Sequence, residues 1–305
     1  MYLYHFGLGE LPFTLTPNTN FYLPMAMHDE ALAVLSTALQ TGEGFIKVVG
    51  EVGTGKTLLC RKLLNEIPDH FVTAYIPNPY LNPDELRRAV AVELGVKQAQ
   101  RMSLPLLTER IQTRLLELHS QGHSVVLILD EAQALPEDSL EALRLFTNLE
   151  TETRKLLQVV LFAQPELDQR LAKTEFRQLR QRITFAYKLR AMNSDEVQQY
   201  IHHRLQVAGY KGAELFPAKI CKRITHVSQG VPRLVNILCH KMLMLAYGQG
   251  HYKMTVKLLN AAVQDTESIV TSSKVSAVTL LTLTVVSTVS LAYYFFSNFL
   301  VGLGE

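Results

Sequence analysis

Residues 50–57 carry a glycine-rich pattern that few backbone arrangements accommodate. They read Gly-Glu-Val-Gly-Thr-Gly-Lys-Thr, between a β-branched run at 45–49 and a leucine-rich run at 58–64. Glycines let the backbone curl so that successive N–H groups converge, and a helix start adds the positive end of its dipole. The pattern therefore predicts a strand, a phosphate-binding loop and a helix in that order. The alternative is a chance match in a glycine-containing turn, and the flanking strand and helix signals argue against it.

This loop predicts ATP and Mg²⁺ as ligands. The amine of Lys56 is expected to reach the β- and γ-phosphates, and the hydroxyl of Thr57 is expected to bind Mg²⁺. The residues expected to contact the nucleotide are Gly50, Glu51, Val52, Gly53, Thr54, Gly55, Lys56, Thr57 and Leu58.

Composition and charge narrow the class of protein. The chain has 305 residues, 48% of them hydrophobic, which is enough for two compact domains with a sizeable core. Its net charge of +2 argues against a basic nucleic-acid binder, so a nucleic-acid partner is not expected. The three cysteines lie far apart without metal-ligand spacing, and we expect them to be core residues in a reducing compartment.

The C-terminal stretch differs from the rest because residues 275–304 contain no charged residue. Residues 275–296 are its most apolar part, and as a helix they would span about 33 Å, close to the thickness of a bilayer core. This predicts a transmembrane helix at 275–296 with a short tail at 297–305. The alternative is a buried helix of the soluble fold. Lys274 before the span favours the N-terminal side in the cytoplasm.

Strand and helix signals alternate up to residue 190. Apolar runs predict strands at 45–49, 71–76, 125–129, 157–162 and 184–189, with helices between them. This alternation predicts an α/β core with a parallel sheet over residues 1–190. Only helical signals follow, which predicts a helical domain over 191–270. Residues 1–30, rich in aromatics and proline, are expected to be an irregular lead-in packed on the sheet domain.

Two adjacent acids follow the most apolar of these strands. Asp130 comes directly after residues 125–129, and Glu131 is next. Hydrolysis of a nucleoside triphosphate needs a carboxylate near Mg²⁺ and a group that orients or deprotonates water. We expect Asp130 in the metal shell and Glu131 beside the attacking water. The alternative is a solvated acidic turn.

Gln164 follows the strand at 157–162, where its amide is expected to orient the lytic water. The alternative role is a cap for the following helix. His28 is expected either to border an adenine pocket with Phe21 or Tyr22, or to be an ordinary residue at a helix start.

Four arginines are candidates for contact with the γ-phosphate. Arg177, Arg180 and Arg182 precede the strand at 184–189, where guanidinium groups suit phosphate in a neighbouring subunit. The alternative for these three is a solvated helix face. Arg233 falls in the first turn of a predicted helix, where a positive charge interacts unfavourably with the helix dipole. We therefore expect its guanidinium to contact either the γ-phosphate or a nearby acid.

Together these motifs resemble the ExeA/GspA family of AAA+ ATPases, which serve secretion and pilus assembly. The resemblance covers about residues 4–265. The residues that carry it include Leu129-Asp130-Glu131-Ala132-Gln133, Gln164-Pro165-Glu166-Leu167, Leu179-Arg180-Gln181-Arg182-Ile183 and Gly230-Val231-Pro232-Arg233-Leu234-Val235-Asn236.

The resemblance implies a five-stranded AAA+ core with a C-terminal helical lid. It implies a Walker A motif at Gly50–Thr57 and a Walker B motif at Asp130 and Glu131. Gln164 falls at the sensor-1 position, where many AAA+ proteins carry Asn or Thr. Arg182 is the preferred arginine finger and Arg233 the sensor-2 arginine.

The predicted function is that of an ATPase in the bacterial inner membrane, with a single span and a cytoplasmic ATPase domain. We expect a homo-oligomer that touches membrane lipid and an inner-membrane or periplasmic partner of a pilus or secretion system. In the family, a peptidoglycan-binding domain follows the span, and here we expect a partner to supply it. Two alternatives are a DNA-binding AAA+ regulator, as in transposition target selection, and a nucleotide switch with slow turnover.

Overall fold

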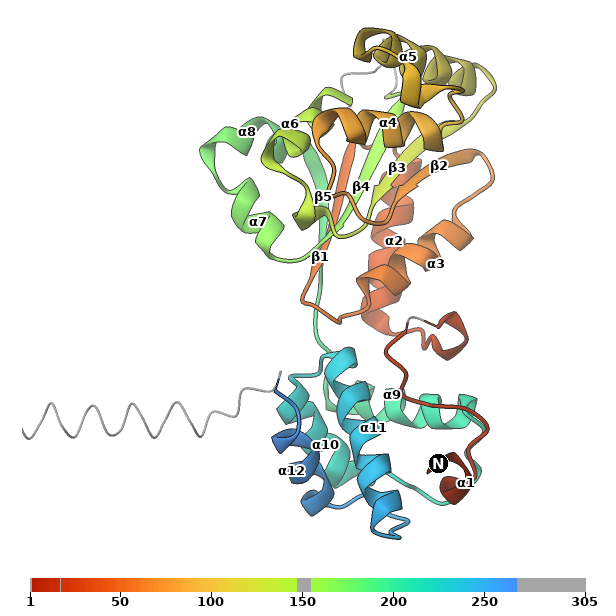
Figure 1. Cartoon of the computed structure of the whole chain (residues 1–305), viewed down its shortest axis with the longest axis vertical. Helices are drawn as coiled ribbons and strands as arrows, with labels where there is room; N and C mark the ends of the chain where they lie inside the picture. The colour runs from red at the N-terminus through yellow and green to blue at the C-terminus, as the bar shows by residue number, and fades with distance from the viewer. Residues whose placement is uncertain (1, 17, 147–154, 268–305) are drawn as a thin grey trace, which may run out of the picture. The chain divides into compact units, whose positions relative to one another are not determined.

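The computed structural model describes residues 2–16, 18–146 and 155–267. The chain divides into two compact units, Met1–Ala262 and Val263–Glu305, and the first contains all the strands described (Figure 1). These strands form one parallel sheet in the order β2-β3-β4-β1-β5. Their bounds are β1 Phe45–Gly50, β2 Phe71–Ile76, β3 Ser124–Leu129, β4 Leu157–Ala163 and β5 Ile183–Leu189. The predicted α/β class and parallel sheet are confirmed.

The register of the sheet brings three distant segments to one edge. Val49 pairs with Ala163 between β1 and β4, and Leu129 pairs with Leu161 between β3 and β4. The carboxyl ends of these three strands therefore lie side by side. The segments that leave them are the glycine loop, the Asp-Glu pair and Gln164, and the first and last of these lie more than a hundred residues apart in the sequence. In open parallel sheets this edge is where ligands bind.

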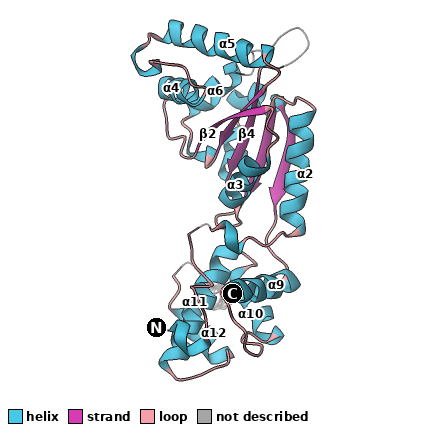
Figure 2. Ribbon diagram, turned by 90° about the vertical axis from the view of Figure 1, so that its right-hand side faces the viewer, coloured by secondary structure: helices cyan, strands magenta, loops and turns pink. Residues whose placement is uncertain are grey.

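Both faces of the sheet are covered, which explains why β3 is apolar throughout. Val125, Leu127 and Leu129 face one core, and Val126 and Ile128 face the other. Helices cover the two faces of the sheet (Figure 2). The first core is completed by α4 Pro83–Glu93, α5 Leu104–Ser120, α6 Glu137–Phe146, α7 Glu166–Leu171 and α8 Arg177–Arg182. The second is completed by α2 Ala26–Gln40 and α3 Lys56–Glu66.

Helix starts follow the local sequence. Asn82 caps α4, accepting from the N–H groups of Asp84 and Glu85, while the Glu85 carboxylate accepts from the Asn82 N–H. Asn193 and Glu196 form the same reciprocal pair at the start of α9 Ser194–Val207. Each pair satisfies three backbone N–H groups at the start of its helix.

The remaining helices described after the sheet are α10 Ala218–Ser228, α11 Pro232–Gly248 and α12 Val256–Gln264. The N-terminal segment contacts α9 and α11. Gly9 donates to the carbonyl of Ala208 at 2.8 Å, and the buried Arg204 of α9 donates to the carbonyl of Pro12. The predicted irregular lead-in on the sheet domain is wrong in two respects, because residues Tyr2–Phe6 form helix α1 and this helix contacts α11. Long-range contacts of this kind leave no periodic signal in the sequence.

The predicted transmembrane helix at 275–296 and the tail at 297–305 lie outside the described residues. Among residues 2–16, 18–146 and 155–267, no helix has the length and hydrophobicity needed to cross a membrane.

Gly230, just before α11, allows a close contact that a larger residue would prevent. Its φ is +68°, and an added Cβ would lie 2.0 Å from the carbonyl oxygen of Met192. The amide of Met192 donates to the carbonyl of Gly230 at 3.0 Å, which ties the link after β5 to the start of α11. Gly230→Ala is expected to lower the free energy of unfolding by more than about 2 kcal/mol through steric overlap and left-handed backbone strain.

Thermal melting followed by circular dichroism checks this expectation. Gly248→Ala is the matched control, because Gly248 ends α11 without a positive φ and its added Cβ would meet nothing within 4 Å. A melting temperature for Gly230→Ala equal to that of the control would contradict the close contact.

Candidate active site

The glycine loop follows β1 and leads directly into α3. Gly53 and Gly55 have φ values of +82° and +97°, in the left-handed region that side chains disfavour. Gly50 lacks room for a side chain, since an added Cβ would lie 2.7 Å from the Thr54 hydroxyl oxygen. α3 then begins at Lys56. The backbone therefore has the curled form that directs N–H groups at an anion.

Lys56 lies within the curve of this loop. Its Nζ donates to the carbonyl oxygens of Gly50 at 2.8 Å and Glu51 at 3.0 Å, and the residue is 5% exposed. Burial lowers the pKa of the Lys56 amine, while the carboxylates of Glu131 and Asp130 act in the opposite direction. A buried cation without a paired carboxylate is costly, so the site favours a bound anion.

Asp130 lies behind the loop, at the end of β3. It is 2% exposed, and its carboxylate accepts from the backbone N–H of Glu131 at 2.9 Å and from the hydroxyl of Thr57. Burial raises the pKa of the Asp130 carboxyl above its ordinary value. Mg²⁺ in nucleotide sites is held by one or two protein oxygens together with phosphates. The adjacent hydroxyl and carboxylate of Thr57 and Asp130 fit this requirement. No group of three or more His, Cys, Asp or Glu in the described residues could hold a metal.

Glu131 is fixed by two amides. Its Oε2 accepts from Nε2 of Gln164 at 3.0 Å and also from Nε2 of Gln133. The Oε1 of Gln133 accepts in turn from the backbone N–H of Gln164 at 2.9 Å. Glu131 itself has a φ of +55°, unusual for a residue with a side chain. This network joins the segments that follow β3 and β4, and it fixes the orientation of the Glu131 carboxylate.

Gln133 is the residue that the sequence reasoning missed. Gln133 belongs to the motif that contains Asp130 and Glu131, but the sequence analysis predicted no role for its side chain. A signal was present, because a polar amide closely follows an acid at the end of a buried strand. Its partner at Gln164 is 31 residues away and was not predictable from spacing.

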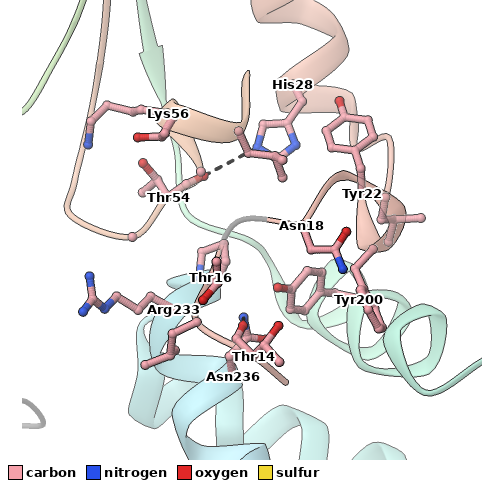
Figure 3. A pocket seen from close by; sticks show the side chains of 18 of the residues that line it. Thr14, Thr16, Asn18, Tyr22, His28, Thr54, Lys56, Tyr200, Arg233 and Asn236 are labelled. Atoms are coloured by element: carbon pink, nitrogen blue, oxygen red, sulfur yellow. Dashed lines mark hydrogen bonds between the residues drawn. The ribbon is translucent and has the colours of Figure 1, made fainter. Parts of the chain in front are cut away.

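A cavity of about 230 Å³ lies at this edge of the sheet (Figure 3). Of the predicted residues, those that line it are Val52, Gly53, Thr54, Gly55, Lys56, Thr57, Leu58, Glu131, Gln164 and Arg233. Gly50, Glu51 and Asp130 do not line it, but the Asp130 carboxylate accepts from two residues that do, Thr57 and Glu131. The N-terminal segment contributes further lining residues, including Phe21 and Tyr22, together with His28 from α2.

The arginine candidates occupy different places. Arg233, in the first turn of α11, is exposed and its backbone N–H donates to the carbonyl of Gly53 at 3.3 Å. Arg182 does not line the cavity, and its guanidinium donates to the carbonyl of Arg144 at 3.0 Å. Arg180 donates to the carbonyls of Leu171 and Ala172, and Arg177 is exposed. The cavity therefore contains one of the four, Arg233, and the other three stay predictions for a neighbouring subunit.

The raised pKa of Asp130 has a consequence for stability. Because the folded state favours the protonated carboxyl, the ionised form lowers the free energy of unfolding at every pH above the folded pKa. Asp130→Asn keeps an oxygen acceptor and removes the charge. We expect it to raise the free energy of unfolding by about 1 kcal/mol near pH 8 without nucleotide or Mg²⁺. The gain should shrink as the pH falls through the folded pKa, where Asp130 takes up a proton.

Denaturant unfolding at several pH values measures this difference. Asp168→Asn is the control, because Asp168 is an exposed acid paired with Lys47, and its replacement should give no gain. A less stable Asp130→Asn protein near pH 8 would show that the carboxylate's hydrogen bonds outweigh its burial.

Comparison with known proteins places this geometry in a family. An AAA domain family matches residues 39–171. General secretion pathway protein A of Aeromonas hydrophila is 42% identical over 254 residues, which cover 83% of this chain and 46% of that protein. The chain thus spans about half the length of this curated relative.

Solved structures agree on the fold. The ORC2 protein of Aeropyrum pernix, solved as ADPNP-ADP complexes, has a TM-score of 0.60 at 18% identity, covering 86% of this chain and 75% of that one. Cdc6p of Pyrobaculum aerophilum has a TM-score of 0.62 at 18% identity, covering 83% and 70%. At this identity the likeness concerns the fold alone. The glycine loop, the Asp-Glu pair and Gln164 at one sheet edge, with the likeness to General secretion pathway protein A, show that the chain belongs to the ExeA/GspA family of AAA+ ATPases.

Proposed function

We propose that this protein is a membrane-anchored ATPase that couples ATP hydrolysis to conformational change in an oligomer, in support of a secretion or type IV pilus machine. The family membership supports the ATPase class, and the name of the Aeromonas relative supports the link to secretion. Residues 1–190 would form the nucleotide-binding core and residues 191–270 the lid. The apolar stretch 275–296 would anchor the protein in the bacterial inner membrane, with the ATPase domain on the cytoplasmic side.

The observation that carries this proposal is the fixed carboxylate of Glu131 in the cavity of the glycine loop. Two amide donors hold it there, and Lys56 and Thr57 line the same cavity. A site that only binds nucleotide would not need a second acid beside Asp130, because the negative charge of Glu131 repels the phosphates. A carboxylate held in this way can accept a proton from an attacking water.

The other residues take roles that follow from their positions. The loop N–H groups and Lys56 would bind the phosphates, and Thr57 and Asp130 would hold Mg²⁺. When bound, Mg²⁺ supplies charge neutralisation at the phosphate oxygens. Gln164 would keep the Glu131 carboxylate oriented and would also hydrogen-bond to the attacking water. Arg233 would approach the γ-phosphate from α11, and its backbone contact with Gly53 gives that helix a direct link to the loop.

Glu131→Gln tests the catalytic assignment. The variant keeps the size of the side chain and removes the proton acceptor, so we expect ATP affinity near wild type and turnover reduced by about 100-fold or more. Steady-state phosphate release and binding of a fluorescent ATP analogue give the two values. Lys56→Ala is the matched variant for binding, and it should lose affinity. Phosphate release near wild type in Glu131→Gln would overturn the proposed role.

Arg182 tests whether the site is completed by a second subunit. Arg182 is absent from the cavity of its own chain, so an arginine finger at this position would act on a neighbour. Arg182→Ala alone is expected to lose turnover by about 100-fold or more. Mixing it with Glu131→Gln protein should restore part of the activity, because some interfaces then combine an intact Arg182 with an intact Glu131. An unchanged rate on mixing would indicate that Arg182 has a structural role within its own chain.

A gel shift with duplex DNA at varied salt separates this proposal from a DNA-binding regulator. Binding to phosphates would weaken steeply with salt. We expect no shift at physiological salt, and a specific shift there would favour the regulator.

A further inference from the structure

Three residues that line the cavity have a buried polar atom without a hydrogen-bond partner in the described part of the chain. One atom is the hydroxyl of Tyr22, and the other two are Nδ1 of His28, on α2, and Oδ1 of Asn236, on α11. His28 and Asn236 are each 6% exposed. In Figure 3 they lie on different sides of the cavity, His28 beside Thr54 and Tyr22, and Asn236 beside Thr14. Leaving a buried polar atom unpaired is costly, so a ligand is expected to pair with both.

The surroundings of His28 determine what its free nitrogen can do. Its Nε2 faces the carbonyl oxygen of Thr54 at 3.5 Å, which favours the tautomer with hydrogen on Nε2. Burial lowers the pKa of His28, so the ring is neutral at physiological pH. Nδ1 then carries a lone pair and is an acceptor. The ring of Tyr22 lies 5.9 Å from that of His28, which gives this side of the cavity an aromatic wall.

Asn236 is also an acceptor. Its Nδ2 donates to the carbonyl oxygen of Thr14 at 3.5 Å, which leaves Oδ1 as the unpaired atom. Asn236 lies about one turn after Arg233 on α11, and Thr14 and Thr16 are nearby lining residues. This side of the cavity therefore presents several polar side chains, with the hydroxyl-bearing ring of Tyr200 beside them (Figure 3).

The unpaired atoms require a ligand that presents hydrogen-bond donors. The hydroxyl of Tyr22 is also unpaired, but a hydroxyl can donate or accept and sets no such requirement. A flat base suits the aromatic side. Bases offer exocyclic amines or ring N–H groups as donors, and the donor of adenine is its exocyclic amine. Ribose hydroxyls suit the polar side. An acceptor facing the carbonyl of hypoxanthine or guanine would stay unpaired and be repelled.

We propose that Nδ1 of His28 recognises the amino group of adenine and that Oδ1 of Asn236 accepts from a ribose hydroxyl, so that these two residues set the nucleoside specificity of the site. The inference rests on the proposed function and adds the residues that select ATP from other triphosphates. Each acceptor acts on one end of the nucleoside, so their effects are separable.

Displacement of a fluorescent ATP analogue from the full-length chain tests this, with ATP, ITP and 2′,3′-dideoxy-ATP as competitors. ITP differs from ATP in having a carbonyl in place of the amine. For the wild type, both analogues should bind about tenfold or more weakly than ATP. His28→Phe should remove the preference for ATP over ITP and keep that over dideoxy-ATP. Asn236→Leu should do the opposite.

His203→Phe is the matched control. Its Nε2 is also buried and unpaired within the described part of the chain, but His203 does not line the cavity, so its loss should leave both preferences unchanged. Melting curves identify variants that do not fold, and His28→Leu is the second variant for that position.

The outcomes separate this inference from the proposed function. Wild-type protein that binds none of the three nucleotides would overturn both. Wild-type protein that binds ATP and ITP equally, or variants with unchanged ratios, would overturn the specificity assignment and leave the ATPase proposal standing. Equal loss of all three nucleotides in a folded variant would show that the residue shapes the cavity without selecting the nucleoside.

Discussion

The parallel pairing of β4 between β1 and β3 is the constraint on which the candidate site depends. Hydrogen bonds between these strands place their carboxyl ends side by side, with Val49 opposite Ala163 and Leu129 opposite Leu161. The glycine loop, the Asp-Glu pair and Gln164 lie together only because this register holds. The two cores support the register, because each central strand buries alternate side chains on opposite faces. A shift by one residue would exchange the two faces.

Around this edge, several polar groups are buried at a cost to stability. Lys56 and Asp130 are buried with pKa values displaced by that burial, and His28 and Asn236 have unpaired acceptors. Such groups are expected where a fold keeps a site ready for a charged, hydrogen-bonding ligand. Glu131 is different, because Gln133 and Gln164 already satisfy its carboxylate. His28 and Asn236 thus keep unpaired acceptors for a ligand, whereas the proposed proton acceptor Glu131 is already held in place.

Much of the fold was predictable because its signals are local. The five strands matched their apolar runs to within two residues, and the capping pair of Asn82 and Glu85 involves residues only three positions apart. Positions along the chain likewise identified Lys56, Thr57, Glu131 and Gln164, all of which line one cavity. The N-terminal segment was less predictable, because its contacts with α9 and α11 join residues about 200 positions apart.

By itself, the sequence determined the phosphate loop, the order of strands and helices, and the acids that follow β3, since each depends on residues adjacent in the chain. The tertiary structure alone decided that Gln133 bridges Glu131 and Gln164, and that His28 and Asn236 leave acceptors in the same cavity as the loop. The physical reason is that these groups come from separate strands and helices. Their proximity depends on strand register and helix packing, and no spacing within a single segment records it.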